Sequence, residues 1–181
     1  PLISTRHNAG IGANDKINVA LIGCKGMGMY NLTDHLKQPG IDCIAMCDVD
    51  DNILQDRAKT VHELTGKTPA LFTDYRQVID HKDIDVVIIG TPDHWHCLPA
   101  VHACEAGKDV YGEKPLSYDI REGQMMLKEL DKNNRIFQLG TQIHATDNYH
   151  RVVEIIQSGA IGKVHTIRLW KNGFTPGLGF P

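Results

Sequence analysis

Two charged side chains stand next to each other in the stretch Tyr111-Gly112-Glu113-Lys114-Pro115. An ammonium group beside a carboxylate can stabilise a developing alkoxide, or carry the proton that accompanies hydride transfer. Lys114 is therefore the candidate catalytic residue, with Glu113 as the neighbour that orients it. The tripeptide Glu-Lys-Pro also occurs in ordinary exposed loops, so these residues indicate a catalytic site only if other site residues lie near them.

A second cluster, Thr91-Pro92-Asp93-His94-Trp95-His96, follows an apolar segment. The His-x-His spacing occurs in metal-dependent hydrolases, but the further carboxylate and histidine ligands of such a barrel are not recognisable, so we expect no metal. Two interpretations remain: contact with a nicotinamide cofactor, or loop histidines without a chemical role.

A glycine-rich turn, Gly23-Cys24-Lys25-Gly26-Met27-Gly28, joins an apolar segment to a helical one, and Asp48 follows about twenty residues later. This order is typical of a site for the pyrophosphate and adenosine ribose of a dinucleotide. Lys25 occupies the position of the middle glycine, so either Gly26 takes over that role or the turn is reshaped. Asp48 favours NAD over NADP, because a carboxylate repels a 2′-phosphate.

These clusters need a scaffold, and apolar segments alternate with helical patterns from Lys16 onward. That alternation predicts a parallel sheet covered on both faces, with ligands beyond the carboxyl ends of its strands. The predicted strands are Ile17–Ile22, Asp42–Cys47, Ala70–Phe72, Val86–Ile89, Val110–Tyr111 and Arg135–Leu139. The predicted helices are Met27–Lys37, Asp50–Thr65, Tyr75–Asp80, Leu98–Ala106, Asp119–Asn133 and Tyr149–Ser158.

The pattern changes near residue 141. Residues Lys163–Lys171 alternate apolar and polar side chains, which predicts a strand in a sheet with one covered face. We therefore expect a flexible tail over residues 1–14, a dinucleotide-binding domain over 15–140, and the incomplete start of a second domain over 141–181.

The composition is that of an ordinary globular protein, with 181 residues, 41% hydrophobic residues and a net charge of −3. Scattered charges give no reason to expect binding to nucleic acid, and no apolar run reaches the roughly 20 residues that span a bilayer. The odd number of cysteines, five, favours free thiols and a reducing compartment. The polar start also fits the remnant of a processed leader, so a cytoplasmic and a periplasmic location both stay open.

Taken together, the clusters resemble the Gfo/Idh/MocA family of nicotinamide-dependent oxidoreductases over about residues 15 to 171. The resemblance implies an α/β fold, a Rossmann-type doubly wound parallel sheet, followed by an α+β domain with an antiparallel sheet. That second domain would form the substrate pocket and the interface of a homo-oligomer. The motifs that carry the resemblance are Ile22–Gly28, Cys47-Asp48, Thr91–His96, Gly107–Pro115 and Gly159–Val164.

The resemblance also assigns roles by position. The glycine turn with Gly23 and Lys25 would hold the pyrophosphate through Gly26, Met27 and Gly28, and Asp48 would hold the adenosine ribose. The residues that would line the nicotinamide side are Thr91, Pro92, Trp95 and His96. Glu113 and Lys114 would contact the nicotinamide ribose, with Lys114 also reaching the reacting hydroxyl, and Gln142 would offer an amide to the cofactor. The family's second catalytic group is expected beyond Pro181, so this chain alone is not expected to turn over substrate.

The leading hypothesis is an NAD-dependent oxidoreductase that moves a hydride between nicotinamide and a secondary hydroxyl of a sugar, sugar derivative or polyol. An NAD-dependent glycoside hydrolase or lyase that oxidises a ring carbon transiently would share the same cofactor-binding half. A third hypothesis is a non-catalytic NAD-binding sensor, in which Lys114 would be dispensable.

Overall fold

The computed structural model describes residues 16–170, and the chain divides into two units between Thr141 and Gln142. The first unit contains a six-stranded sheet in the order β3-β2-β1-β4-β5-β6, with every neighbouring pair parallel. This order, with its reversal between β1 and β4, is that of a Rossmann fold and confirms the predicted class. The strands are β1 (Ile17–Ile22), β2 (Ile41–Cys47), β3 (Ala70–Phe72), β4 (Val86–Ile89), β5 (Asp109–Glu113) and β6 (Phe137–Gly140).

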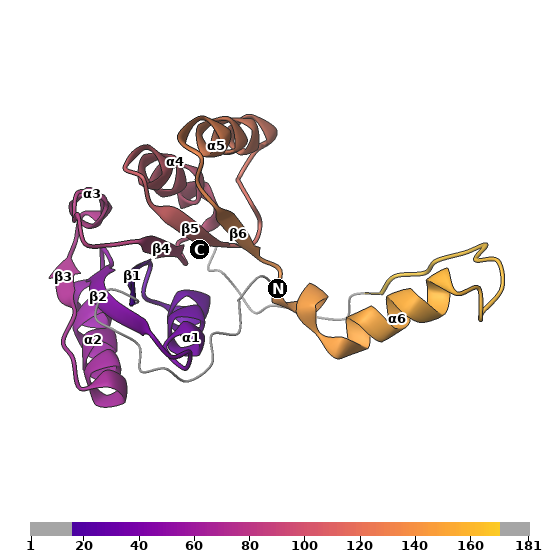
Figure 1. Cartoon of the computed structure of the whole chain (residues 1–181), viewed down its shortest axis with the longest axis horizontal. Helices are drawn as coiled ribbons and strands as arrows, with labels where there is room; N and C mark the ends of the chain where they lie inside the picture. The colour runs from indigo at the N-terminus through magenta and orange to yellow at the C-terminus, as the bar shows by residue number, and fades with distance from the viewer. Residues whose placement is uncertain (1–15, 171–181) are drawn as a thin grey trace, which may run out of the picture. The chain divides into compact units, whose positions relative to one another are not determined.

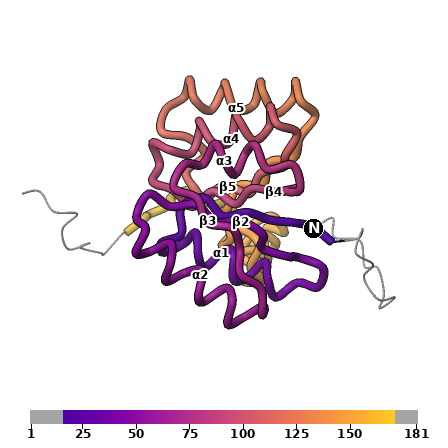
Figure 2. Tube along the Cα trace, turned by 90° about the vertical axis from the view of Figure 1, so that its left-hand side faces the viewer, coloured from indigo at the N-terminus to yellow at the C-terminus, as the bar shows by residue number. Residues whose placement is uncertain are grey.

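Helices cover both faces of this sheet: α1 and α2 lie on one face, and α3, α4 and α5 on the other (Figures 1 and 2). The ends of these helices and strands differ from the predicted ends by at most two residues. Within residues 16–170, no helix is both long and apolar enough to cross a lipid bilayer. The helices are α1 (Gly26–His35), α2 (Asp51–Thr65), α3 (Tyr75–Ile79), α4 (Cys97–Glu105) and α5 (Ile120–Asn133), with a short 3₁₀ helix η2 (Asp93–Trp95) before α4.

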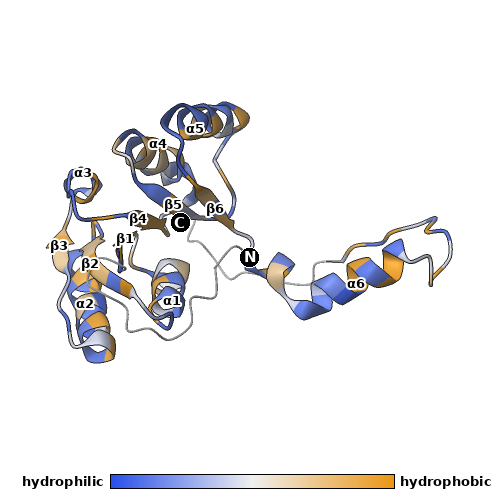
Figure 3. Cartoon of the chain, in the orientation of Figure 1, coloured by the Kyte–Doolittle hydropathy of each residue, from blue (hydrophilic) through white to orange (hydrophobic). Residues whose placement is uncertain are grey.

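The core consists of two apolar layers, one on each face of the sheet. Because side chains alternate along a strand, β1 supplies both layers. Val19 and Leu21 pack with α1 and α2, while Ala20 and Ile22 pack with α3 and α4. The hydropathy colours show β4 as a hydrophobic strand between these layers (Figure 3). This two-sided burial explains the unbroken apolar runs of the sequence.

The second unit contains a short 3₁₀ helix η3 (Gln142–Ala145) and the helix α6 (Asp147–Gln157). The strand predicted over Lys163–Lys171 is wrong for residues 163–170, which have no regular secondary structure, and Lys171 lies outside the described residues. Period-two alternation shows which side chains share a face, but a strand forms only beside a pairing partner. The described part of this unit offers no such strand. The predicted tail over residues 1–14 also lies outside the described residues.

A candidate dinucleotide site at the carboxyl edge of the sheet

A cavity of about 610 Å³ lies at the carboxyl ends of β1 to β4, where the strand order reverses. Its size is that of a typical small-ligand pocket. The lining brings together three parts of the chain that the sequence singled out: the glycine turn, Asp48 and the loop after β4. The sequence-predicted residues in its wall are Gly23, Lys25, Asp48, Thr91, Pro92 and Trp95.

Three glycines pack backbone against backbone at the floor of this site. A Cβ on Gly28 would overlap the carbonyl oxygen of Gly23, and one on Gly90 would overlap the Cα of Gly28. Gly23 has a φ of +87°, and its own Cβ would lie 2.7 Å from the carbonyl carbon of Gly90. No L side chain larger than hydrogen fits at this crossing of the turn, helix α1 and the end of β4.

The helix α1 begins without a side-chain cap. Lys25 precedes it in an ordinary extended conformation, with φ −98° and ψ 157°, so a lysine is accommodated at the middle position of the motif. Gly26 instead adopts the left-handed conformation, with φ +48° and open space where a Cβ would stand. Of the two alternatives for this turn, the geometry therefore favours Gly26 as the residue that needs to be glycine.

Three other helices of the first unit begin with a side-chain cap, unlike α1 and α4. Asp50, Asp74 and Asp119 accept hydrogen bonds from backbone N–H groups at the starts of α2, α3 and α5. An aspartate at the start of α1 would repel a phosphate, whereas uncapped N–H groups and the helix dipole attract one. The site thus fits the pyrophosphate of a dinucleotide.

Asp48 is held in place by the backbone on both sides of the cavity rim. One carboxylate oxygen accepts the N–H of Cys24 at 2.7 Å, and the other accepts the N–H of Asp50 at 3.0 Å. Each carboxylate oxygen has a second lone pair, so the pair can still accept the hydroxyls of a ribose. Burial, and then the negative charge of Asp48, raise the pKa of the Cys24 thiol well above its usual range, so this thiol stays protonated beside the turn.

The loop after β4 is closed on itself by short hydrogen bonds. The Thr91 hydroxyl donates to the Trp95 carbonyl at 3.0 Å, and the Trp95 N–H donates to the Pro92 carbonyl at 2.8 Å. Trp95 is 44% exposed and lies in the cavity wall. Unlike Thr91 and Trp95, His96 is buried, at 2% exposure, and each of its ring nitrogens lies within hydrogen-bond distance of a backbone carbonyl oxygen. Spacing alone did not indicate that a histidine of this cluster would be buried.

Glu113 is also buried, at 5% exposure, and it accepts a 2.9 Å hydrogen bond from the side chain of Asn31. Its other carboxylate oxygen accepts the N–H of Lys114 at 3.2 Å, while the Lys114 side chain is exposed. None of the sequence motifs includes Asn31. A signal existed, because this amide lies three positions after Gly28 and next to Leu32 among the buried residues of α1, where an apolar residue is the norm.

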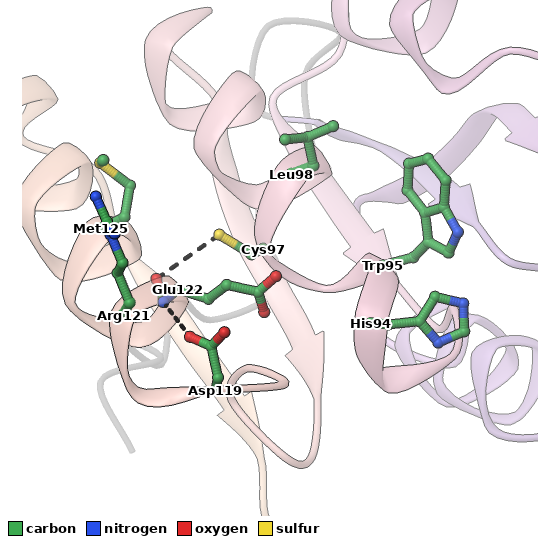
Figure 4. A pocket seen from close by; sticks show the side chains of 8 residues that line it. All are labelled: His94, Trp95, Cys97, Leu98, Asp119, Arg121, Glu122 and Met125. Atoms are coloured by element: carbon green, nitrogen blue, oxygen red, sulfur yellow. Dashed lines mark hydrogen bonds between the residues drawn. The ribbon is translucent and has the colours of Figure 1, made fainter.

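A second cavity, of about 510 Å³, lies between the starts of α4 and α5 (Figure 4). It shares His94 and Trp95 with the first cavity. Asp119 and Glu122 stand in its wall, and both are already bonded to backbone N–H groups. Across the described part of the chain, no group of three or more His, Cys, Asp or Glu side chains is arranged to hold a metal ion.

Gln142 belongs to η3 of the second unit, whereas every other predicted site residue lies in the first. Its contact with the cofactor stays a prediction.

The family is established by comparison with known proteins. A family model described as "Oxidoreductase family, NAD-binding Rossmann fold" matches residues 17–141. The chain belongs to this Gfo/Idh/MocA family, and its Rossmann domain is of the NAD-binding kind. The resemblance drawn from the motifs is thereby confirmed.

Among curated relatives, inositol 2-dehydrogenase of Salmonella paratyphi B is 32% identical over 147 residues, which cover 78% of this chain and 42% of the relative. A glycosyl hydrolase family 109 protein of Shewanella pealeana is 24% identical over 83% of this chain and 34% of its own length. The chain therefore spans less than half the length of the curated relatives it matches.

Comparison with solved structures leads to the same family. Myo-inositol 2-dehydrogenase of Lactobacillus plantarum is 30% identical with a TM-score of 0.73, covering 82% of this chain and 43% of that protein. Scyllo-inositol dehydrogenase of Lactobacillus casei, solved with bound NAD(H) and scyllo-inositol, is 26% identical with a TM-score of 0.73, covering 81% and 42%.

Proposed function

We propose that this protein works as an NAD-dependent dehydrogenase on a secondary hydroxyl of a polyol or sugar, and that this chain supplies its cofactor-binding domain. The observation that carries the proposal is the single cavity that joins the glycine turn, Asp48 and the Thr91–Trp95 loop. Similarity to inositol dehydrogenases supports a cyclic polyol as the substrate class.

In this proposal, some residues of the chain bind the cofactor and Lys114 handles the proton. Asp48 accepts the hydroxyls of the adenosine ribose, and the uncapped start of α1, at Gly26, Met27 and Gly28, faces the pyrophosphate. Bound NAD supplies the hydride acceptor. Lys114 holds the proton of the reacting hydroxyl, with its backbone fixed by Glu113.

A second candidate is NAD-assisted cleavage of a glycoside. The observation in its favour is the similarity to glycosyl hydrolase family 109 proteins over the same part of the chain. Both functions need the same cofactor cavity, so they differ in what is done to the substrate after it binds.

Cofactor binding can be tested by calorimetric titration of this chain with NAD and with NADP. Asp48→Asn should weaken NAD binding about tenfold or more, because it exchanges a charged acceptor for a weaker one that also carries a donor. Asp42→Asn is the matched control, since it removes the same charge from a carboxylate bonded to Lys16 and Lys67 near the start of β2. Equal effects of the two changes, or NADP binding as tight as NAD, would contradict the proposal.

The reaction can be tested in any longer form of the protein that carries a substrate domain. Formation of NADH with myo-inositol supports the dehydrogenase. Release of p-nitrophenol from a glycoside, with NAD retained and no net NADH, supports the second candidate. A protein that binds NAD but gives neither NADH nor p-nitrophenol would support the third hypothesis, a non-catalytic NAD-binding sensor. In that case Lys114→Ala should leave NAD binding unchanged.

A further inference from the structure

His96 makes two short contacts that a neutral ring cannot both satisfy. Its Nδ1 lies 2.7 Å from the carbonyl oxygen of Pro115, and its Nε2 lies 2.9 Å from the carbonyl oxygen of Thr91. Carbonyl oxygens only accept hydrogen bonds, and a neutral imidazole carries a single N–H. Both contacts are hydrogen bonds only when both ring nitrogens are protonated. His96 is 2% exposed, so bulk water does not replace a missing bond.

The two carbonyls belong to different strand ends. Thr91 follows β4, Pro115 follows β5, and His96 directly precedes α4. The ring therefore ties together two neighbouring loops at the edge of the sheet where the cofactor cavity lies. Charge-assisted hydrogen bonds are about twice as strong as neutral ones, so a ring protonated on both nitrogens would hold the two loops more firmly than a neutral ring.

The residue between these supports is Lys114. On one side of it, Glu113 is held by the Asn31 side chain and by the N–H of Lys114 itself. On the other side, Pro115 is held by His96. Both neighbours of Lys114 are thus fixed by buried polar groups. The backbone of Lys114 is therefore restrained, although its side chain is exposed.

We propose that His96 is a positioning residue, an imidazolium that clamps the loops after β4 and β5 and so holds the backbone from which Lys114 reaches the cofactor. The proposal rests on the proposed function in one respect, the contact between Lys114 and bound cofactor. It replaces direct contact with nicotinamide as the role of His96.

A matched pair of variants separates the two bonds. The amide nitrogen of asparagine lies about as far from the backbone as imidazole Nδ1 does, and the amide nitrogen of glutamine about as far as Nε2. His96→Asn should keep the bond to Pro115 and bind NADH about threefold more weakly than the wild type, whereas His96→Gln, which loses that bond, should bind about tenfold more weakly. Both variants lose the charge and keep one bond, so a purely structural role would weaken binding equally in both, and that result would overturn the proposal.

A double-mutant cycle tests whether His96 acts through Lys114. The loss caused by His96→Gln should shrink below about twofold in a Lys114→Ala background, because the group being positioned is then gone. Losses that simply multiply would overturn the proposal.

Ring protonation can be read directly in the wild-type chain labelled with ¹⁵N-histidine, even if the variants do not fold. Proton-coupled signals from both ring nitrogens of His96 at neutral pH support the clamp, and an unprotonated nitrogen overturns it. Failure of the wild type to bind NADH would contradict the proposed function instead, while the ring signals would still report on the clamp.

Discussion

The two ends of the cofactor site, the glycine turn and the loops after β4 and β5, are held in shape by different interactions. Around the glycine turn, the shape is set by backbone packed on backbone at Gly23, Gly28 and Gly90. Around the loops after β4 and β5, it is set by hydrogen bonds of buried polar side chains, above all His96 and the Asn31–Glu113 pair. A backbone crossing tolerates no added methyl group, whereas a side-chain network can be altered one bond at a time.

The largest effect should come from a methyl group at the backbone crossing. Gly28→Ala would push a Cβ into the Gly23 carbonyl and lower the free energy of unfolding by about 3 kcal/mol or more, because backbone cannot yield cheaply. Urea denaturation measures this loss.

Gly26→Ala is the control, since a Cβ there meets open space and costs only the left-handed backbone, about 1–2 kcal/mol. Equal losses in the two variants would show that the close packing of Gly28 on Gly23 does not limit which residue fits there.

Removal of the buried amide should cost less. Asn31→Leu leaves the Glu113 carboxylate without one of its donors, so we expect a loss of about 2 kcal/mol in the free energy of unfolding. Asn52→Leu, at an exposed position of α2, should change it by less than about 0.5 kcal/mol. A neutral or stabilising effect of Asn31→Leu would show that apolar packing serves this end of the site equally well.

Alkaline pH should lower the free energy of unfolding, through two buried thiols in strand β2. Burial raises the pKa of both the Cys43 and the Cys47 thiols from 9.0 to about 12. Because the unfolded chain releases these protons first, the stabilisation is complete below pH 9 and is lost as the pH rises toward 12. Urea midpoints measured between pH 8 and pH 11 should fall, and should fall less steeply in a Cys43→Ala, Cys47→Ala variant. Parallel curves for the two proteins would contradict this origin.

The smallest effect is expected far from both ends of the site. Lys67 pairs with Asp42 at 2.7 Å near the start of β2, where its side chain is 52% exposed. Lys67→Met should change the free energy of unfolding by less than about 1 kcal/mol and leave NAD binding as it was. A larger change in NAD binding would mean that distant surface charges also contribute to the cofactor site.

Much of this protein could be predicted because its signals are local. Apolar runs such as Val86–Ile89 predicted the strands, and Asp119 at the start of an apolar-periodic stretch predicted a helix start. Prediction failed where the answer depended on a distant partner. The alternation over residues 163–170 needs a pairing strand, and the burial of His96 depends on Pro115, which lies nineteen positions further along the chain.

The amino-acid sequence by itself determined the alternation of strands and helices, the turn at Gly23–Gly28 and the carboxylate at Asp48, because each depends on residues close together in the chain. Only the tertiary structure decided that Gly90 closes on Gly28, that Asn31 supports Glu113 and that His96 joins two loops. Those three contacts arise where parallel strands bring their carboxyl ends to one edge, and no local pattern records which side chains meet there.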